Sequence, residues 1–114
     1  MRSLAAVVFL VLAALTPAAA QFVGPSAQGR VATVSDVQNA RLGTYVTVTG
    51  NIVDHQRRDF FTFRDATGDI RVEIDPGVWQ GREVLPATTV RLLGEVDRGW
   101  AGRYLWVKSL EILK

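Results

Sequence analysis

Two alternating segments, Thr44–Val53 and Val90–Asp97, most constrain what this chain can fold into, because each carries a glycine at its centre. Apolar residues at every second position have the period of a half-buried β-strand. A glycine inside such a strand is useful where the strand bends sharply or bulges, as at the corner of a barrel. The pattern therefore predicts curved strands. Their inward positions are Val46, Val48, Gly50 and Ile52 in the first segment and Val90, Leu92, Gly94 and Val96 in the second.

Three further strands are predicted, at Phe60–Arg64, Asp69–Asp75 and Gly102–Leu113. Asp65-Ala66-Thr67-Gly68 has turn composition, with Gly68 suited to a positive φ, so it should join the first two of these strands as a hairpin. The alternation of the last strand slips near Lys108, which predicts a β-bulge. The expected core consists of Val48, Ile52, Phe61, Phe63, Ile70, Val72, Leu92 and Val96.

A short helix is predicted over Thr33–Gly43, with Val34, Val37 and Ala40 towards the core. Ser35 and Gln38 fit a capping box, while Thr33 is a competing N-cap. Gly43 would end the helix.

One helix followed by five short, curved strands favours an all-β fold. The prediction is a five-stranded Greek-key barrel of the OB type with a short N-terminal helix. A small β-sandwich is the alternative, but that architecture usually needs about seven strands.

The N-terminus has the order of a secretory signal peptide. Met1-Arg2-Ser3 is followed by the apolar run Leu4–Leu15, and Ala18-Ala19-Ala20 supplies an A-x-A cleavage site. A membrane anchor is the alternative, but a span needs about 20 apolar residues. We predict a cleaved leader at 1–20, a flexible arm at 21–32 and one domain at 33–114, with no transmembrane anchor after cleavage.

Composition narrows the function classes. The chain has 13 basic and 11 acidic residues, and the expected cleavage removes one arginine, so the remaining net charge is close to zero. A general polyanion binder would show a clear basic excess. Cysteine is absent, so the domain has no disulfide and depends on packing for its stability.

Several segments taken in order resemble a known family. They are Phe22–Pro25, Thr33-Val34, Val48–Val53, Phe63–Ile70, Val72–Asp75 with Trp79, and Gly94–Asp97. Together with the leader they resemble the bacterial OB-fold (BOF) family of YgiW/YdeI-type periplasmic stress-tolerance proteins. The resemblance implies an OB barrel, a periplasmic location, no known enzymatic activity and a link to envelope or oxidative stress. It supplies no catalytic residues.

Catalytic and metal chemistry find little support in the residues. His55 is the one histidine of a chain without cysteine, so a transition-metal site would need carboxylates such as Asp54 and Asp59. We interpret His55 as an exposed loop residue and predict no enzymatic activity, no metal and no cofactor. Charged residues on the outward strand faces are interpreted as cross-strand pairs in solvent. They are Arg64, Arg71, Glu73, Arg91 and Glu95.

Two predicted loops, Asp54–Asp59 and Asp97–Arg103, flank the usual binding face of an OB barrel. Arginines beside an aromatic ring can hold a phosphate, a carboxylate or a sugar face. The candidate ligand-binding residues are Arg57, Arg58, Arg98, Trp100 and Arg103. The alternative is that the arginines are solvated and Trp100 packs as a lid. Trp79 and Trp106 are predicted to be core residues.

The sequence therefore predicts a non-enzymatic periplasmic binding or adaptor protein that supports envelope stress tolerance. Its partner could be an envelope protein, a glycan or a small anionic ligand. The alternative is a module for single-stranded nucleic acid or oligosaccharide, with Trp100 or Tyr104 stacking on bases. The leader and the nearly balanced charge argue against nucleic acid.

Overall fold

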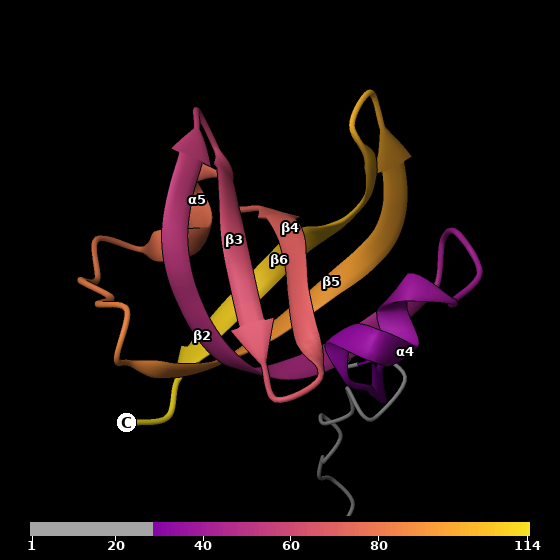
Figure 1. The fold of residues 1–114 in the computed structure, drawn as a ribbon. Coiled ribbons are helices and arrows are strands. Elements are labelled where there is room, and N and C mark those ends of the chain that lie inside the picture. The colour runs from indigo at the N-terminus through magenta and orange to yellow at the C-terminus, as the bar shows by residue number, and fades with distance from the viewer. Residues whose placement is uncertain (1–28) are drawn as a thin grey trace, which may run out of the picture.

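Strand β2 (Tyr45–Arg57) organises the barrel because it pairs with two different strands. The protein is represented by a computed structural model that describes residues 29–114. The first half of β2 pairs with β5 (Thr89–Gly99), from Tyr45 to Asn51, and the second half pairs with β3 (Phe60–Asp65). With β4 (Gly68–Glu73) and β6 (Gly102–Ile112), the order β2-β3-β4-β6-β5 closes on itself (Figure 1). The predicted five-stranded OB-type barrel is confirmed.

Gly50 lies where β2 changes from one partner to the other. A Cβ at this position would overlap the carbonyl of Arg64 on β3 and would lie 2.9 Å from Cζ of Phe63. A Cβ at Gly94 of β5 would lie 2.6 Å from Cγ of Leu105. The two mid-strand glycines therefore permit close approach of neighbouring strands at bends of the barrel, as predicted.

The barrel interior is filled by aliphatic side chains and one phenylalanine. Seven of the eight predicted core residues are buried, and the exception is Phe61, which is half-buried near the start of β3. The core residues are Val34, Val37, Val46, Val48, Ile52, Phe63, Ile70, Val72, Ile74, Val90, Leu92, Val96, Leu105, Val107 and Leu110. The predicted bulge is confirmed, because the β5–β6 register skips Lys108. Two further bulges, at Val53 and Gln56 of β2, were not predicted.

Helix α4 (Val34–Gln38) is shorter than the predicted helix. Thr33, not Ser35, is the N-cap, and its capping box is completed by Asp36. The choice is made by tertiary contacts: the Val34 amide donates to Oδ2 of Asp65, and the Ser35 amide donates to the Thr67 hydroxyl, both at 2.9 Å. These acceptors belong to the β3–β4 turn, so α4 begins where that turn holds it. Gly43 has φ 90° but lies five residues past the helix end.

Two short elements were not predicted. Arg30–Val31 form β1, which pairs in parallel with β2, although the sequence placed them in the arm. Pro76–Trp79 form α5, a single turn between β4 and β5 that begins with proline. The predicted leader and most of the arm lie outside the described residues. In the described part, no helix has the length and apolar character needed to cross a membrane.

Candidate functional site

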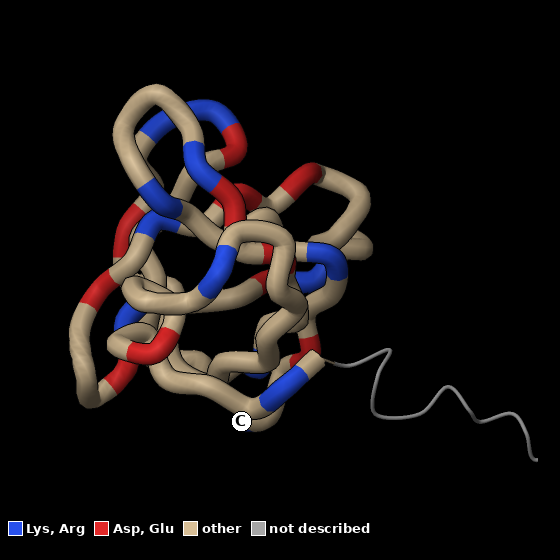
Figure 2. Tube along the Cα trace, turned by 90° about the vertical axis from the view of Figure 1, so that its right-hand side faces the viewer, with Lys and Arg blue, Asp and Glu red and all other residues tan. Residues whose placement is uncertain are grey.

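The two predicted loops are the ends of long hairpins. Strand β2 continues to Arg57, which leaves Arg58 and Asp59 as the turn before β3, and Arg58 has φ 50°. Strand β5 continues to Gly99, which leaves Trp100 and Ala101 as the turn before β6. Both turns lie at the upper end of the barrel (Figure 1). Basic positions cluster at this end, with acidic positions beside them (Figure 2).

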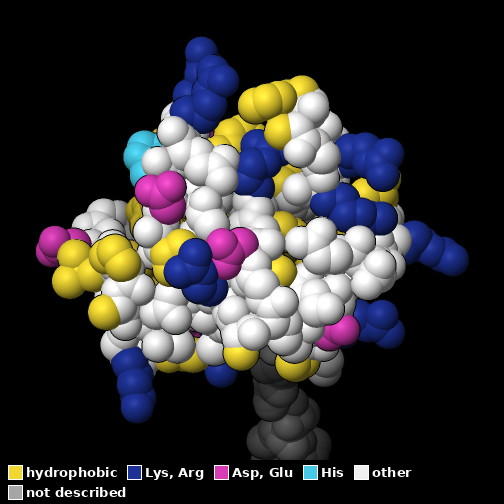
Figure 3. Space-filling model, in the orientation of Figure 1, with side chains coloured by type: hydrophobic (Ala, Val, Ile, Leu, Met, Phe, Trp, Pro, Cys, Tyr) yellow, Lys and Arg dark blue, Asp and Glu magenta, His cyan; other side chains and the backbone are white. Residues whose placement is uncertain are grey.

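Three of the predicted site residues come together there. Arg57, Arg58 and Trp100 line a hollow of about 320 Å³ with Phe60. The guanidinium carbon of Arg57 lies 5.9 Å from the centroid of the Trp100 ring, within reach of a cation–π contact. Trp100 is 77% exposed. Basic and hydrophobic side chains gather at the upper end of the space-filling surface (Figure 3). An indole this exposed is not packed as a lid on the barrel, and its ring is accessible at the surface.

Arg71 of β4 completes this surface, although we predicted a cross-strand charge pair for it. It lies between the buried Ile70 and Val72 and therefore faces outwards. Its guanidinium carbon lies 4.5 Å from the ring centroid of Phe60, 5.3 Å from that of Trp100 and 5.6 Å from that of Tyr104. Nη2 of Arg71 is buried and has no hydrogen-bond partner. We call Arg57, Arg58, Phe60, Arg71, Trp100 and Tyr104 the arginine–aromatic face.

The interpretation of the outward charges as cross-strand pairs is correct only in part. Among the described residues, ion pairs join Arg64 to Asp69 at 2.7 Å and Arg91 to Glu111 at 2.9 Å. Arg71 takes part in neither pair and contacts aromatic rings instead. The interpretation was wrong for Arg71, because the rings of Phe60 and Tyr104 on neighbouring strands and of Trp100 in the β5–β6 turn converge on its position.

Arg98 and Arg103 do not join the arginine–aromatic face. The two are opposite each other in the β5–β6 ladder, one residue along from the pair Asp97 and Tyr104. Because neighbouring strand residues alternate, the arginines face away from Tyr104. Nη1 of Arg103 donates to the Ala40 carbonyl at 2.6 Å and so holds the segment after α4. Arg103 therefore has a structural contact where the sequence suggested a ligand contact.

Carboxylates lie beside the arginine–aromatic face. Oxygens of Asp59, Glu73 and Asp75 lie within 4.8 Å of one another. Burial, followed by the charges of Asp75 and Asp59, raises the pKa of Glu73, and the charge of Arg71 opposes this rise. Burial and the nearby Asp97 likewise raise the pKa of Tyr104. The charge of Arg71 acts on Glu73, so it offsets part of the negative charge of this cluster.

His55 is exposed as predicted, but it belongs to β2 and not to a loop. Its ring stacks on Phe61 with the centroids 4.4 Å apart, and Nε2 lies 2.7 Å from the carbonyl oxygen of Arg58. Both contacts hold the β2–β3 hairpin in place. His55 is therefore engaged in shaping the turn that carries Arg58.

The other two tryptophans have different environments. Trp79 packs against the core and meets the Phe61 ring edge-on at 5.3 Å, as predicted for a core residue. The prediction was wrong for Trp106, which is 36% exposed and has the Lys108 ammonium 3.2 Å from its ring centroid. Trp106 lies between the buried Leu105 and Val107, so alternation turns its ring outwards.

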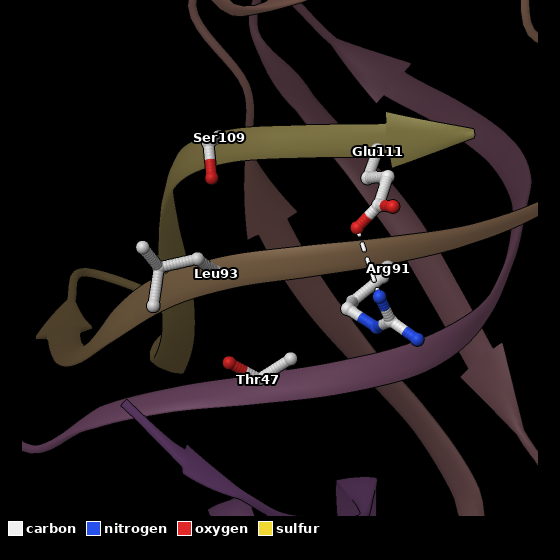
Figure 4. Close-up of a pocket in the computed structure, with 5 residues that line it drawn as sticks. All are labelled: Thr47, Arg91, Leu93, Ser109 and Glu111. Carbon is white, nitrogen blue, oxygen red and sulfur yellow. Dashed lines mark hydrogen bonds and ion pairs between the residues drawn. The ribbon is translucent and has the colours of Figure 1, made fainter. Parts of the chain in front are cut away.

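A second hollow lies on the outer surface of β2, β5 and β6 (Figure 4). Its lining is Thr47, Arg91, Leu93, Ser109 and Glu111. The Arg91–Glu111 ion pair neutralises the charges at one side of it, and no aromatic ring lines it. These side chains offer less to a charged or flat ligand than the arginine–aromatic face does.

Comparisons with known proteins agree with this architecture. Residues 13–112 match the model of the family described as "Bacterial OB fold (BOF) protein". The chain belongs to the bacterial OB-fold family. This BOF protein is 36% identical to Protein YgiW of Escherichia coli K12 over 125 residues, covering 96% of each chain. It is also 40% identical over 96 residues to the "Calcium-regulated OB-fold protein CarO" of Pseudomonas aeruginosa, covering 84% of this chain and 83% of that one.

A solved structure extends the likeness to three dimensions. The structure of the hypothetical protein YgiW from Escherichia coli matches this BOF protein with a TM-score of 0.72 and 41% identity. The match covers 79% of this chain and 95% of that one. The second OB-fold domain of replication protein A from Methanococcus maripaludis matches with a TM-score of 0.57 at 17% identity, a likeness of fold alone.

Proposed function

We propose that this BOF protein is a non-enzymatic binding protein of the periplasm, which holds its ligand on the arginine–aromatic face and supports tolerance of envelope stress. The observation that carries the proposal is the position of Arg71, whose guanidinium lies among three rings with a buried nitrogen that has no hydrogen-bond partner. Leaving a buried donor unpaired costs about 1–3 kcal/mol. Protein atoms cover this nitrogen, so a ligand supplies the missing acceptor only if the guanidinium moves towards it.

The location of this surface on the fold also supports binding. In OB barrels, ligands bind across the middle strands between the first and last hairpin turns. Here β3 and β4 contribute Phe60 and Arg71, and the two turns contribute Arg58 and Trp100. Single-stranded nucleic acid or oligosaccharide remains the second candidate, favoured by the exposed Trp100 ring beside arginines.

Export is the part of the proposal that rests on the leader. Cleavage after Ala20 would leave Gln21 as the first residue. The mass of the intact protein recovered from the periplasm should correspond to residues 21–114, with or without cyclisation of Gln21. Recovery of the full chain in the cytoplasm would contradict both the export and the envelope role.

Trp100→Ala tests the binding surface. Because the ring is 77% exposed, we expect the melting temperature to change by no more than about 2–4 °C. In cells that lack the native copy, the variant should fail to restore survival under envelope stress.

Trp106→Ala is the matched control, because it removes another outward-facing indole away from the hairpin turns. It should restore survival as the unaltered protein does. A Trp100→Ala protein that melts earlier but restores survival would show that the ring packs as a lid and that the ligand binds elsewhere.

A further inference from the structure

The arginine–aromatic face gathers three positive charges without neutralising any of them in an ion pair. Arg57 and Arg58 line the hollow beside Trp100, and the guanidinium carbon of Arg71 lies 5.3 Å from the same ring. Among the described residues, no ion pair involves these three arginines. Like charges held close together repel, and an anion that bridges them removes that repulsion. Three guanidiniums match a ligand group with more than one negative charge.

Arg71 is held in a fixed orientation before any ligand arrives. The Phe60 and Tyr104 rings lie against its guanidinium, and a Cβ at Gly99 would be 3.9 Å from Nη2 and 3.3 Å from the Tyr104 ring. The backbone at Gly99 therefore also lies close to the Tyr104 ring and the Arg71 guanidinium. A planar, pre-oriented guanidinium suits the paired oxygens of a phosphate or carboxylate.

The carboxylates beside the arginine–aromatic face limit how far a bound anion can extend along the barrel. Asp59, Glu73 and Asp75 gather next to Phe60, and Asp97 accepts a hydrogen bond from the Tyr104 hydroxyl at 3.3 Å. An extended polyanion that crossed the barrel would meet these four acidic residues. A compact terminal group at the hairpin turns would meet fewer of them, chiefly Asp59 of the β2–β3 turn.

We infer that the ligand is a phosphomonoester carried on a ring, a proposal that rests on the binding function proposed above. Its phosphate is held by Arg57, Arg58 and Arg71, and its ring lies on Trp100. A phosphomonoester carries a charge of about −1.5 to −2 at neutral pH and offers three acceptor oxygens. A phosphodiester carries one charge and continues on both sides, towards the carboxylates.

Three matched probes test the charge requirement: phenyl phosphate, the diester methyl phenyl phosphate and the neutral phenyl β-glucoside. NMR titration of the exported protein should shift the Trp100 indole and the Arg57 and Arg71 side-chain signals. Phenyl phosphate should bind at least about tenfold more tightly than the diester, and the glucoside should bind least. Glucose 1-phosphate, compared with phenyl phosphate, distinguishes a sugar ring from an aromatic one.

Variants locate the phosphate. Arg58→Gln and Arg71→Lys should each weaken the binding of phenyl phosphate about tenfold. The first removes a positive charge, and the second keeps the charge but loses the planar guanidinium. Arg91→Gln, on the far surface, should leave the affinity unchanged. Equal binding of the three probes at Trp100 would overturn the phosphate proposal and leave the binding surface standing. Shifts confined to another surface, such as the hollow beside Thr47, would overturn both.

Discussion

Replacing Phe63 with alanine lowers the free energy of unfolding by about 3–5 kcal/mol, the largest effect that we expect from one side chain. Phe63 is completely buried, and it is the largest of the fully buried side chains. Its removal leaves a cavity against Gly50, where β2 and β3 approach too closely to collapse further. A domain of this size has a total stability of about 5–15 kcal/mol, so the loss is a large share. Urea denaturation followed by circular dichroism measures it.

Arg64→Ala is the control for this change, because Arg64 is the next residue and points to the opposite face. It loses an ion pair with Asp69 that is exposed and screened by solvent, so the free energy of unfolding should change little. If Phe63→Ala does not fold, Phe63→Leu gives a smaller loss that can still be measured. An unfolding curve for Phe63→Ala like that of the unaltered protein would mean that the faces of β3 are reversed.

Gly50→Ala is expected to destabilise the barrel by about 3 kcal/mol, at the upper end of what overpacking costs. The added methyl group would overlap the Arg64 carbonyl, and a backbone group in a strand ladder cannot rotate away as a side chain can. Relief requires β2 and β3 to separate, which breaks ladder hydrogen bonds at the bend. The thermal midpoint and the urea midpoint should both fall.

Gly77→Ala is the matched glycine substitution. Nothing lies within 4 Å of a Cβ at that position, and alanine is a better helix former than glycine, so stability should stay the same or rise slightly. If Gly50→Ala were as stable as Gly77→Ala, the bend in β2 would not depend on close contact with β3.

The inward and outward faces of the strands could be predicted from the sequence, because a buried interior requires an apolar residue at every second position of a strand. The alternation in β2 and β5 identified the inward residues, and its interruption at Lys108 identified the bulge. The helix start could not be decided in this way, because Ser35 and Thr33 both begin plausible caps. The contacts that select Thr33 come from Asp65 and Thr67, about thirty residues along the chain. Helix α5 is one turn long and has no period to detect.

The candidate site was predicted in part for a related reason. Treating Asp97–Arg103 as a loop grouped Arg98, Trp100 and Arg103, whereas the strands continue almost to Trp100 and alternation separates them. Arg71 was missed because its partners are rings on other strands. In the sequence, Phe60 and Arg71 alternate with inward-facing residues. An outward-facing aromatic residue and an outward-facing arginine were therefore the features from which this surface could have been predicted. Their proximity depends on the barrel closing.

The hairpin turns are separate from the packed core, and this separation affects which residues can change during the evolution of such proteins. None of the fifteen buried hydrophobic residues belongs to residues 53–62 or 97–104, so the turns that carry Arg58 and Trp100 contribute nothing to the packed interior. We therefore expect substitutions at the turn residues Arg58, Asp59, Trp100 and Ala101 to leave the barrel's packing unchanged, whereas Phe61 packs against the core. Relatives with the same interior can therefore differ in the side chains that they present at the hairpin turns, at little risk to folding.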